Sequence, residues 1–299
     1  WELRLDNSYP NVVHNGADPH GAYRLWYGGF IGGKDFATGQ GADRVNAWHY
    51  ANSSDGIAWE KPPLGIFDLS TCASCLPSAR SAGRANNVLM SGDGMGILWD
   101  PEDGNASRRF KAFGTGCFSP TGASTGCVSG VGVSSDGLHF TDPRALTWPA
   151  PQRYDCHQNM VRDPADGTFV LTTRDGFSGG PGRCIGITRG APGGVFGGWN
   201  LSAAPELVEA GTAAHQLYSQ VTFPYYNVWL GLVAVFDTVD PSTVGTVHTR
   251  LSWSHDGRKW QWLDNGGLTG KPFIPLGTTQ APPQCASTWP PVVNAAGRT

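Results

Sequence analysis

The stretch "SSDGIAW" at Ser53–Trp59 has two relatives in the chain, "SSDGLHF" at Ser134–Phe140 and "SHDGRKW" at Ser254–Trp260. Each places an aromatic side chain three residues after the glycine of an Asp-Gly pair. Asp-Gly favours a tight turn between antiparallel strands, because glycine tolerates positive φ. Trp199 in "GGWNLS" occupies the same place without the Asp-Gly, and successive aromatic positions lie 81, 59 and 61 residues apart. The pattern predicts one strand–turn–strand unit used repeatedly.

A second pattern recurs along the chain at a constant place relative to this turn. Short apolar segments follow small or amide residues at steps of 76, 72, 61 and 71 residues, marked by Val12, Val88, Met160, Val221 and Val292. After each of the first four markers come further apolar strands and then, in most units, the Asp-Gly turn. Such a unit is a four-stranded antiparallel sheet, and sheets of this kind bury both faces by stacking radially. We therefore predict an all-β, five-bladed β-propeller with four-stranded antiparallel blades.

The fifth blade is expected to be incomplete in this segment. The prediction is one domain over residues 1–299, with blades at roughly 6–70, 80–150, 155–205 and 215–270 and the start of a fifth at 285–299. The chain opens "WELRLDN" without a methionine, so we expect it to be part of a longer chain.

Composition excludes several classes of function. Charged residues are only 15% of the 299 and the formal net charge is −3, which argues against a nucleic-acid partner. The longest apolar stretch, Val228–Phe236, falls well short of the roughly 20 residues that span a bilayer, so no membrane insertion is expected.

Cysteines and glycosylation sequons indicate a secreted or cell-surface glycoprotein. The expected sites of glycosylation are Asn52, Asn105 and Asn200. The expected disulfides join Cys72 to Cys75, Cys117 to Cys127, and Cys156 to Cys184, which leaves Cys285 over. The "CASC" segment lacks a second ligand pair for zinc, and we expect no metal and no cofactor.

The blade pattern resembles the five-bladed propellers of glycoside hydrolase families 32 and 43 and their uncharacterised relatives. The matching pieces span nearly the whole chain and include "YRLWYGG", "HQNMVRDPADGTFVLTTRD" and "LYSQVTFPYYNVWLGLVAVF". The resemblance implies a substrate site at the end of a central tunnel, where first strands converge. Arg162-Asp163-Pro164 matches the Arg-Asp-Pro triplet of family 32, but it leads directly into "ADG", which also reads as a plain turn like that at Asp18.

Polar residues within or just before the first strands are the candidate carbohydrate-binding groups, together with one arginine of a second strand. They are Asn11, Asn86, Asn87, His157, Gln158, Gln220 and Arg174. The alternative is that these side chains cap strand ends and hold tunnel water.

Glycoside hydrolysis needs two carboxyl groups facing each other. The candidates are Asp6 and Asp155, with Glu206 or Glu209 as proton donor, although neither glutamate lies in a motif that matches the acid/base of the family. The preferred prediction is thus a carbohydrate-binding or structural module, with a glycan and other extracellular domains as partners. The alternative is an active hydrolase that cleaves an exposed glycan through paired carboxylates. A sialidase-like propeller is a third interpretation, but it needs three clustered arginines, and Arg153, Arg162 and Arg174 are poorly placed for it.

Overall fold

The computed structural model describes residues 2, 8–33, 45–116, 128–145, 157–175, 182–190, 206–209, 211–239 and 245–274. Within these ranges the only helical elements are α1 (Pro77–Arg80) and the 3₁₀ turns η1 (Leu69–Thr71), η2 (Ala106–Arg108) and η3 (Gly267–Thr269). Strands make up the rest of the regular structure, so the prediction of an all-β chain is confirmed. No helix in the described part of the chain is long and apolar enough to cross a membrane.

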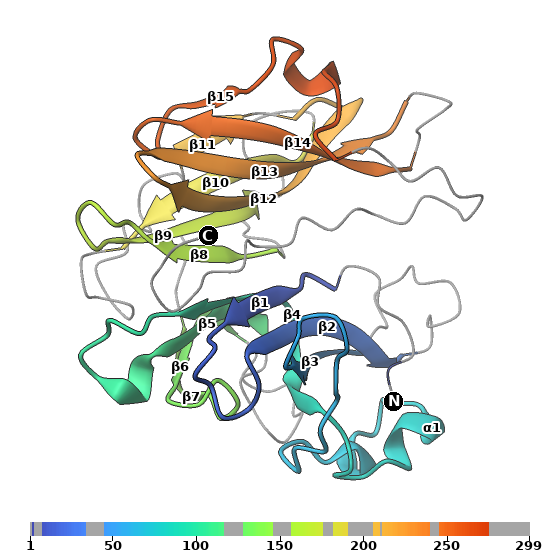
Figure 1. Cartoon of the computed structure of the whole chain (residues 1–299). Coiled ribbons are helices and arrows are strands. Elements are labelled where there is room, and N and C mark those ends of the chain that lie inside the picture. The colour runs from blue at the N-terminus through green and yellow to red at the C-terminus, as the bar shows by residue number, and fades with distance from the viewer. Residues whose placement is uncertain are drawn as a thin grey trace. The chain divides into compact units, whose positions relative to one another are not determined.

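The described strands pair in four antiparallel sheets, of which the first two share β4, and the chain divides into two compact units that are treated separately (Figure 1). In the first unit, β1 (Asn11–His14), β2 (Tyr23–Gly32), β3 (Val45–Ser53) and the start of β4 (Val88–Trp99) form one sheet. The rest of β4 forms a second sheet with β5 (Phe110–Gly116), β6 (Val128–Ser134) and β7 (Thr141–Ala145).

The second unit holds the other two sheets. One has the order β11 (Glu206–Glu209), β10 (Cys184–Arg189), β9 (Phe169–Asp175) and β8 (Asn159–Arg162). The other runs β12 (His215–Tyr225), β13 (Val228–Asp237), β14 (Val247–Ser254) and β15 (Trp260–Trp262). Each sheet is thus a meander in which sequential strands pair, as the repeat analysis expected.

Strand β4 corrects one detail of the sequence analysis. The first strand of the second repeat was placed at Ala85–Leu89, whereas β4 starts at Val88 and serves two sheets. Its first residues pair with β3, and the segment from Gly92 onward pairs with β5. The register breaks between Asp93 and Gly96, where Gly94 has φ +64°, so a glycine-rich bulge redirects one strand from one sheet to the next. Residues 285–299, assigned to a fifth blade, lie outside the described residues.

In the repeated Ser-x-Asp-Gly turn, the aspartate Oδ1 accepts from the backbone N–H groups two and three residues further on at all three places. At the second, Ser134 Oγ accepts from the backbone N–H of Gly137 at 2.9 Å, and Asp136 Oδ1 accepts from those of Leu138 and His139 at 2.8 and 2.9 Å. At the third, the backbone N–H groups of Lys259 and Arg258 lower the pKa of Asp256 to about 2. These carboxylates are engaged within their own turns, and the motif is a structural element of the sheets.

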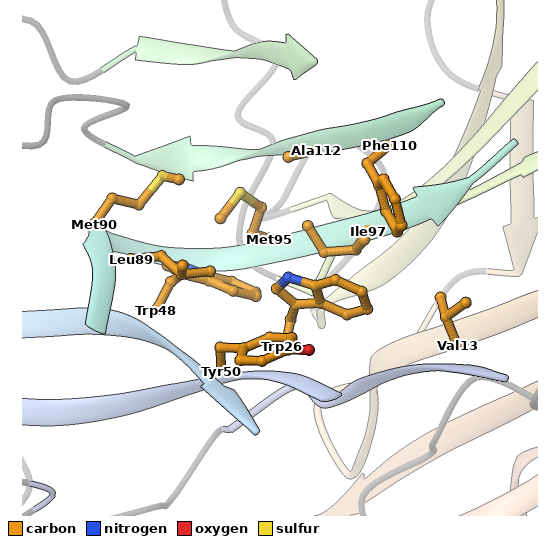
Figure 2. Close-up of a cluster of buried hydrophobic side chains, with 10 residues drawn as sticks. All are labelled: Val13, Trp26, Trp48, Tyr50, Leu89, Met90, Met95, Ile97, Phe110 and Ala112. Carbon is orange, nitrogen blue, oxygen red and sulfur yellow. The ribbon is translucent and has the colours of Figure 1, made fainter. Parts of the chain in front are cut away.

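A hydrophobic core cluster of the first unit is formed by side chains of β1 to β5 (Figure 2), and Leu138 and Phe140 of the second turn pack against it. Trp26 is fully buried and its Nε1 donates to the carbonyl of Gly137 at 2.7 Å. The Arg24 guanidinium lies 4.9 to 5.2 Å from three aromatic rings and donates to the carbonyl of Asp136 at 2.5 Å. Arg24 and Trp26 of β2 therefore anchor the turn that follows β6.

Candidate functional sites

Each of the two units contains one group of polar side chains that contact one another. We call the first the Glu2 cluster, which consists of Glu2, Tyr27, His49, Lys61 and Asn87. We call the second the Arg174 cluster, which consists of His157, Arg174, Arg183, Gln216 and Tyr218.

Two neighbouring strands build the Glu2 cluster. Tyr27 of β2 is directly opposite His49 of β3, and their rings stack with centroids 5.3 Å apart and planes 21° apart. Asn87, just before β4, donates to the Tyr27 hydroxyl at 2.9 Å and to the backbone carbonyl of Tyr50 at 2.8 Å. The Glu2 carboxylate accepts from Asn87 Nδ2 at 3.1 Å, from the Tyr27 hydroxyl and from Lys61 Nζ. One carboxylate is thus held by an amide, a phenol and an ammonium group.

Burial and charge give the members of this cluster defined protonation states. Burial raises the pKa of Glu2, but hydrogen bonds from Lys61, Tyr27 and Asn87 outweigh it, so the pKa lies below its ordinary value. Burial lowers the pKa of His49 to about 4, against the attraction of Glu2. Burial and the hydrogen bond to Glu2 raise the pKa of Tyr27 far above 10. At neutral pH an ionised carboxylate therefore lies beside a neutral imidazole and a neutral phenol, an arrangement that accepts protons or binds hydroxyl groups.

Sequence reasoning selected only Asn87 of these five residues for a site. Tyr27, His49 and Lys61 were missed, because their meeting depends on the register between β2 and β3 and on where the segment at Glu2 lies. The available signal was the pair "YRLWYGG" and "VNAWHYANS", in which polar aromatic residues occur inside adjacent strands.

Asn11 and Asn86 have a structural role in the first unit. Asn11 Nδ2 donates to the carbonyls of Tyr9 and Met95 at 2.9 and 3.1 Å, and its Oδ1 accepts from the N–H of Ile97 at 3.0 Å. The amide of Asn86 likewise donates to the carbonyls of Phe67 and Gly83 and accepts from the N–H of Val88. Both amides hold backbone segments together.

The Arg174 cluster joins strand ends of both sheets in the second unit. His157 immediately precedes Gln158 and β8, Arg174 is near the end of β9, and Arg183 precedes β10. The Arg174 guanidinium lies 4.4 Å from the centre of the Tyr218 ring, and that of Arg183 lies 5.4 Å from the same ring. Arg183 also donates to the Gln216 side chain. Burial, and secondarily the positive charge of Arg174, lower the pKa of His157 to about 3, so this imidazole is neutral.

Two other binding candidates of this unit take different positions. Gln158 follows His157 in the sequence, and its side chain is buried. Gln220 donates to the Thr222 hydroxyl at 3.2 Å and lines a shallow pocket with Trp260 and Trp262 over the sheet of β12–β15. The structure therefore brings His157 and Arg174 together and places Gln220 with a different set of side chains.

The carboxyl candidates are placed only in part. Asp6 and Asp155 lie outside the described residues. Glu206 begins β11, the strand of its sheet that is separated from β8 by β9 and β10. Asp163 of the Arg-Asp-Pro triplet accepts from the N–H of Ala165 at 2.9 Å and pairs with Arg189 at 3.0 Å. This contact matches that between Asp18 and Arg24 in the first sheet, so the triplet forms a hairpin turn held by the partly buried Arg189.

The expected covalent features have separate outcomes. Cys72 and Cys75 form a disulfide with an S–S distance of 2.05 Å. Cys184 is buried at the start of β10, whereas Cys156, Cys117, Cys127 and Cys285 lie outside the described residues. Of the sequons, Asn105 is exposed, Asn52 donates its side-chain N–H to the carbonyl of His20, and Asn200 lies outside the described residues.

Comparison with solved structures gives the fold a context. The chain is similar to an N-acetylgalactosamine deacetylase from F. plautii in complex with blood group B trisaccharide (TM-score 0.52, 16% identity, 86% of this chain and 68% of that chain). It is also similar to the catalytic domain of Coprinopsis cinerea GH62 alpha-L-arabinofuranosidase (TM-score 0.52, 10% identity, 88% of this chain and 68% of that chain). A third similar structure is a thermostable family-43 glycoside hydrolase (TM-score 0.50, 9% identity, 86% of this chain and 72% of that chain). The resemblance to glycoside hydrolases drawn from the repeats is thus confirmed at the level of fold. No family model and no curated protein sequence matches the chain.

Proposed function

We propose that this chain is a glycoside-hydrolase-like five-bladed propeller module that binds a glycan outside the cell. In this proposal each of the four described sheets is one blade. The fold likeness to glycan-acting proteins and the blade pattern support this proposal, and the disulfide between Cys72 and Cys75 is in keeping with an extracellular setting.

The Glu2 cluster is the observation that carries the proposal. An ionised carboxylate, an amide and a tyrosine hydroxyl converge at one place, and such groups bind the hydroxyls of a sugar. The side chains of Glu2 and Lys61 are 12% and 44% exposed, so a ligand would reach the cluster through these two residues, while Tyr27, His49 and Asn87 are buried behind them. A ligand hydroxyl would donate to the Glu2 carboxylate, while the Lys61 ammonium group would donate to a ligand oxygen.

Active hydrolysis is the second candidate function. A retaining mechanism needs carboxyl groups about 5–5.5 Å apart and an inverting one needs about 6.5–9.5 Å. The lowered pKa of Glu2 suits a base or nucleophile and not a proton donor. In this alternative Asp6 or Asp155 is the nucleophile and Glu206 or Glu209 is the proton donor. Loss of an acid is worth roughly 10²–10⁴-fold in rate, so a chain without one binds glycan with little turnover.

The test uses the full chain and a panel of neutral polysaccharides and aryl glycosides that covers arabinans, xylans, galactans and fructans. We expect binding by affinity electrophoresis, weakened at least tenfold by Glu2→Gln. The exposed Glu60→Gln is the matched control and should leave binding unchanged. If the folded chain binds none of these polysaccharides and glycosides, the proposal is contradicted. Rapid hydrolysis abolished by Asp155→Asn would instead establish the enzyme.

A further inference from the structure

The repeated Ser-x-Asp-Gly turn has different surroundings at its three places. In the second turn, the Arg24 guanidinium donates to the carbonyl of Asp136 at 2.5 Å and Trp26 Nε1 donates to the carbonyl of Gly137 at 2.7 Å. Both donors lie in the first sheet, which precedes the sheet of this turn along the chain. Leu138 of the turn also packs against the core that contains Trp26. The preceding sheet therefore covers the second turn.

The third turn is covered in the same manner. Arg189 of β10 donates to the carbonyl of Gly257 at 3.0 Å, and its other terminal nitrogen pairs with Asp163 at 3.0 Å. Arg24 pairs in the same way with Asp18 at 3.4 Å. In both cases an aspartate after the first strand of one sheet holds an arginine that reaches the turn of the next sheet. The two arginines are on different strands, so the contact is defined by its place in the sheet.

The first turn, Ser53–Trp59, presents the corresponding groups to solvent. Asp55 Oδ1 accepts from two backbone N–H groups at 2.8 Å, as in the other turns. Ile57 is 85% exposed, although it has the position at which Leu138 packs against a core. Within the part of the chain that the structure describes, no side chain donates to the carbonyl of Asp55 or of Gly56. An apolar side chain and two carbonyl acceptors are thus exposed where the other two turns meet a preceding sheet.

We propose that the first turn is the docking surface for the C-terminal segment of this chain, residues 290–299, with Arg298 in the place that Arg24 takes at the second turn. This inference rests on the proposed five-bladed propeller. In a closed propeller the fifth blade is the neighbour of the first, as the first is of the second. The contact would therefore join the two ends of the ring.

The sequence of this segment fits the role. Arg298 is the only residue after Lys271 with a cationic side chain. It comes six residues after the marker Val292, and the "NAAG" directly before it is short enough for a hairpin turn. In the first sheet Arg24 likewise follows the first hairpin, as the second residue of β2. A guanidinium group has several N–H donors and no acceptor, so it suits a surface of carbonyl oxygens.

The test is photo-cross-linking of the full chain. Irradiation of an Ile57→p-benzoylphenylalanine variant should join the first turn to residues 290–299 within one copy of the chain, as read by peptide mapping of the monomeric product. The same replacement at the exposed Ala58 gives an independent second reading. The matched control is the same replacement at His139, whose side chain is 65% exposed in the second turn and should not cross-link to this segment. A near-ultraviolet circular dichroism spectrum matching wild type shows that each variant is folded.

A second substitution tests the arginine itself. Combined with the variant at Ile57, Arg298→Gln should lower the cross-link yield at least fivefold, because the donor to the turn carbonyls is lost. Arg80→Gln also removes an exposed arginine from the first unit and should leave the yield unchanged.

Each outcome separates this inference from the function on which it rests. Cross-links from the first turn only to other parts of the chain, or none in folded variants, overturn the docking assignment. Cross-links found only in a concentration-dependent dimer identify a second copy as the occupant and also overturn it. A yield unchanged by Arg298→Gln overturns the role of the arginine. The binding of polysaccharides and aryl glycosides is measured separately, so glycan binding can persist in every one of these cases.

Discussion

Replacing Gly137 with alanine tests whether the repeated Asp-Gly turn is a packing element. Gly137 has φ +73°, and an added Cβ would lie 2.9 Å from Cδ1 of Phe110 and 2.9 Å from Cζ2 of Trp26. Neither ring can move easily, because both are buried and Trp26 is hydrogen-bonded to the carbonyl of Gly137 itself. The substitution therefore combines backbone strain with overpacking.

Gly65 is the matched control for the strain alone. It has φ +70°, and an added Cβ there would meet nothing within 4 Å. A left-handed conformation costs alanine about 1–2 kcal/mol relative to glycine, and this applies to both sites. Overpacking of a core costs about 1–3 kcal/mol more. We thus expect Gly65→Ala to lower the free energy of unfolding by about 1–2 kcal/mol and Gly137→Ala by about 2–5 kcal/mol.

Urea unfolding followed by tryptophan fluorescence measures this difference. The dependence of the unfolding free energy on urea concentration should be equal in the two variants, because it reports the surface that unfolding exposes. The two variants should differ by at least about 1 kcal/mol. If Gly137→Ala is no less stable than Gly65→Ala, the contact of this turn with Trp26 and Phe110 does not support the first unit and the reasoning is wrong.

Three further predictions concern the buried polar groups and the surface. The pKa of His49 falls from 6.5 to about 4 on folding, so between these pH values the unfolded chain binds more protons than the folded chain. The free energy of unfolding should therefore drop by about 3 kcal/mol as pH is lowered from 6.5 to 4. In a pH series of urea midpoints His49→Phe should flatten this drop, and an unchanged slope would count against a buried neutral imidazole. Asn11→Ala should lower the free energy of unfolding by about 2–4 kcal/mol, because buried partners on β4 lose their hydrogen bonds; a loss below about 0.5 kcal/mol in the same urea assay would show that the amide is dispensable. In a glycosylating host, peptide mapping should find a glycan on the exposed Asn105 and none on Asn52, whose side-chain N–H is engaged by the carbonyl of His20; the reverse pattern would refute this assignment.

The repeats predicted the meander well because their signals are local. The Asp-Gly turns at Asp55, Asp136 and Asp256 close through hydrogen bonds within a few residues, so the sequence alone specifies them. The boundary at β4 was misplaced because a strand shared by two sheets follows from pairing with both β3 and β5, and no local pattern reports two partners.

The candidate sites were only partly predictable. Asn87, His157 and Arg174 were selected by their position before or at the end of strands, and the structure brings each into a polar cluster. Asn11 was selected by the same rule, yet its amide is used by the backbone of Tyr9, Met95 and Ile97. Position along a strand is the same for these residues, so only the tertiary structure shows which polar groups each of them meets.

The sequence by itself determined the secondary-structure class, the turns and the repeat length, because periodicity and glycine placement act over a few residues. Tertiary structure alone decided which polar groups meet. Tyr27 and His49 face each other through strand register, and Lys61 reaches Glu2 across 59 positions of the chain. Arg174 and Arg183 share Tyr218 because a bulge turns that ring toward them. Charge and burial, and hence the protonation states of both clusters, depend on these long-range contacts, since they arise only when the sheets pack.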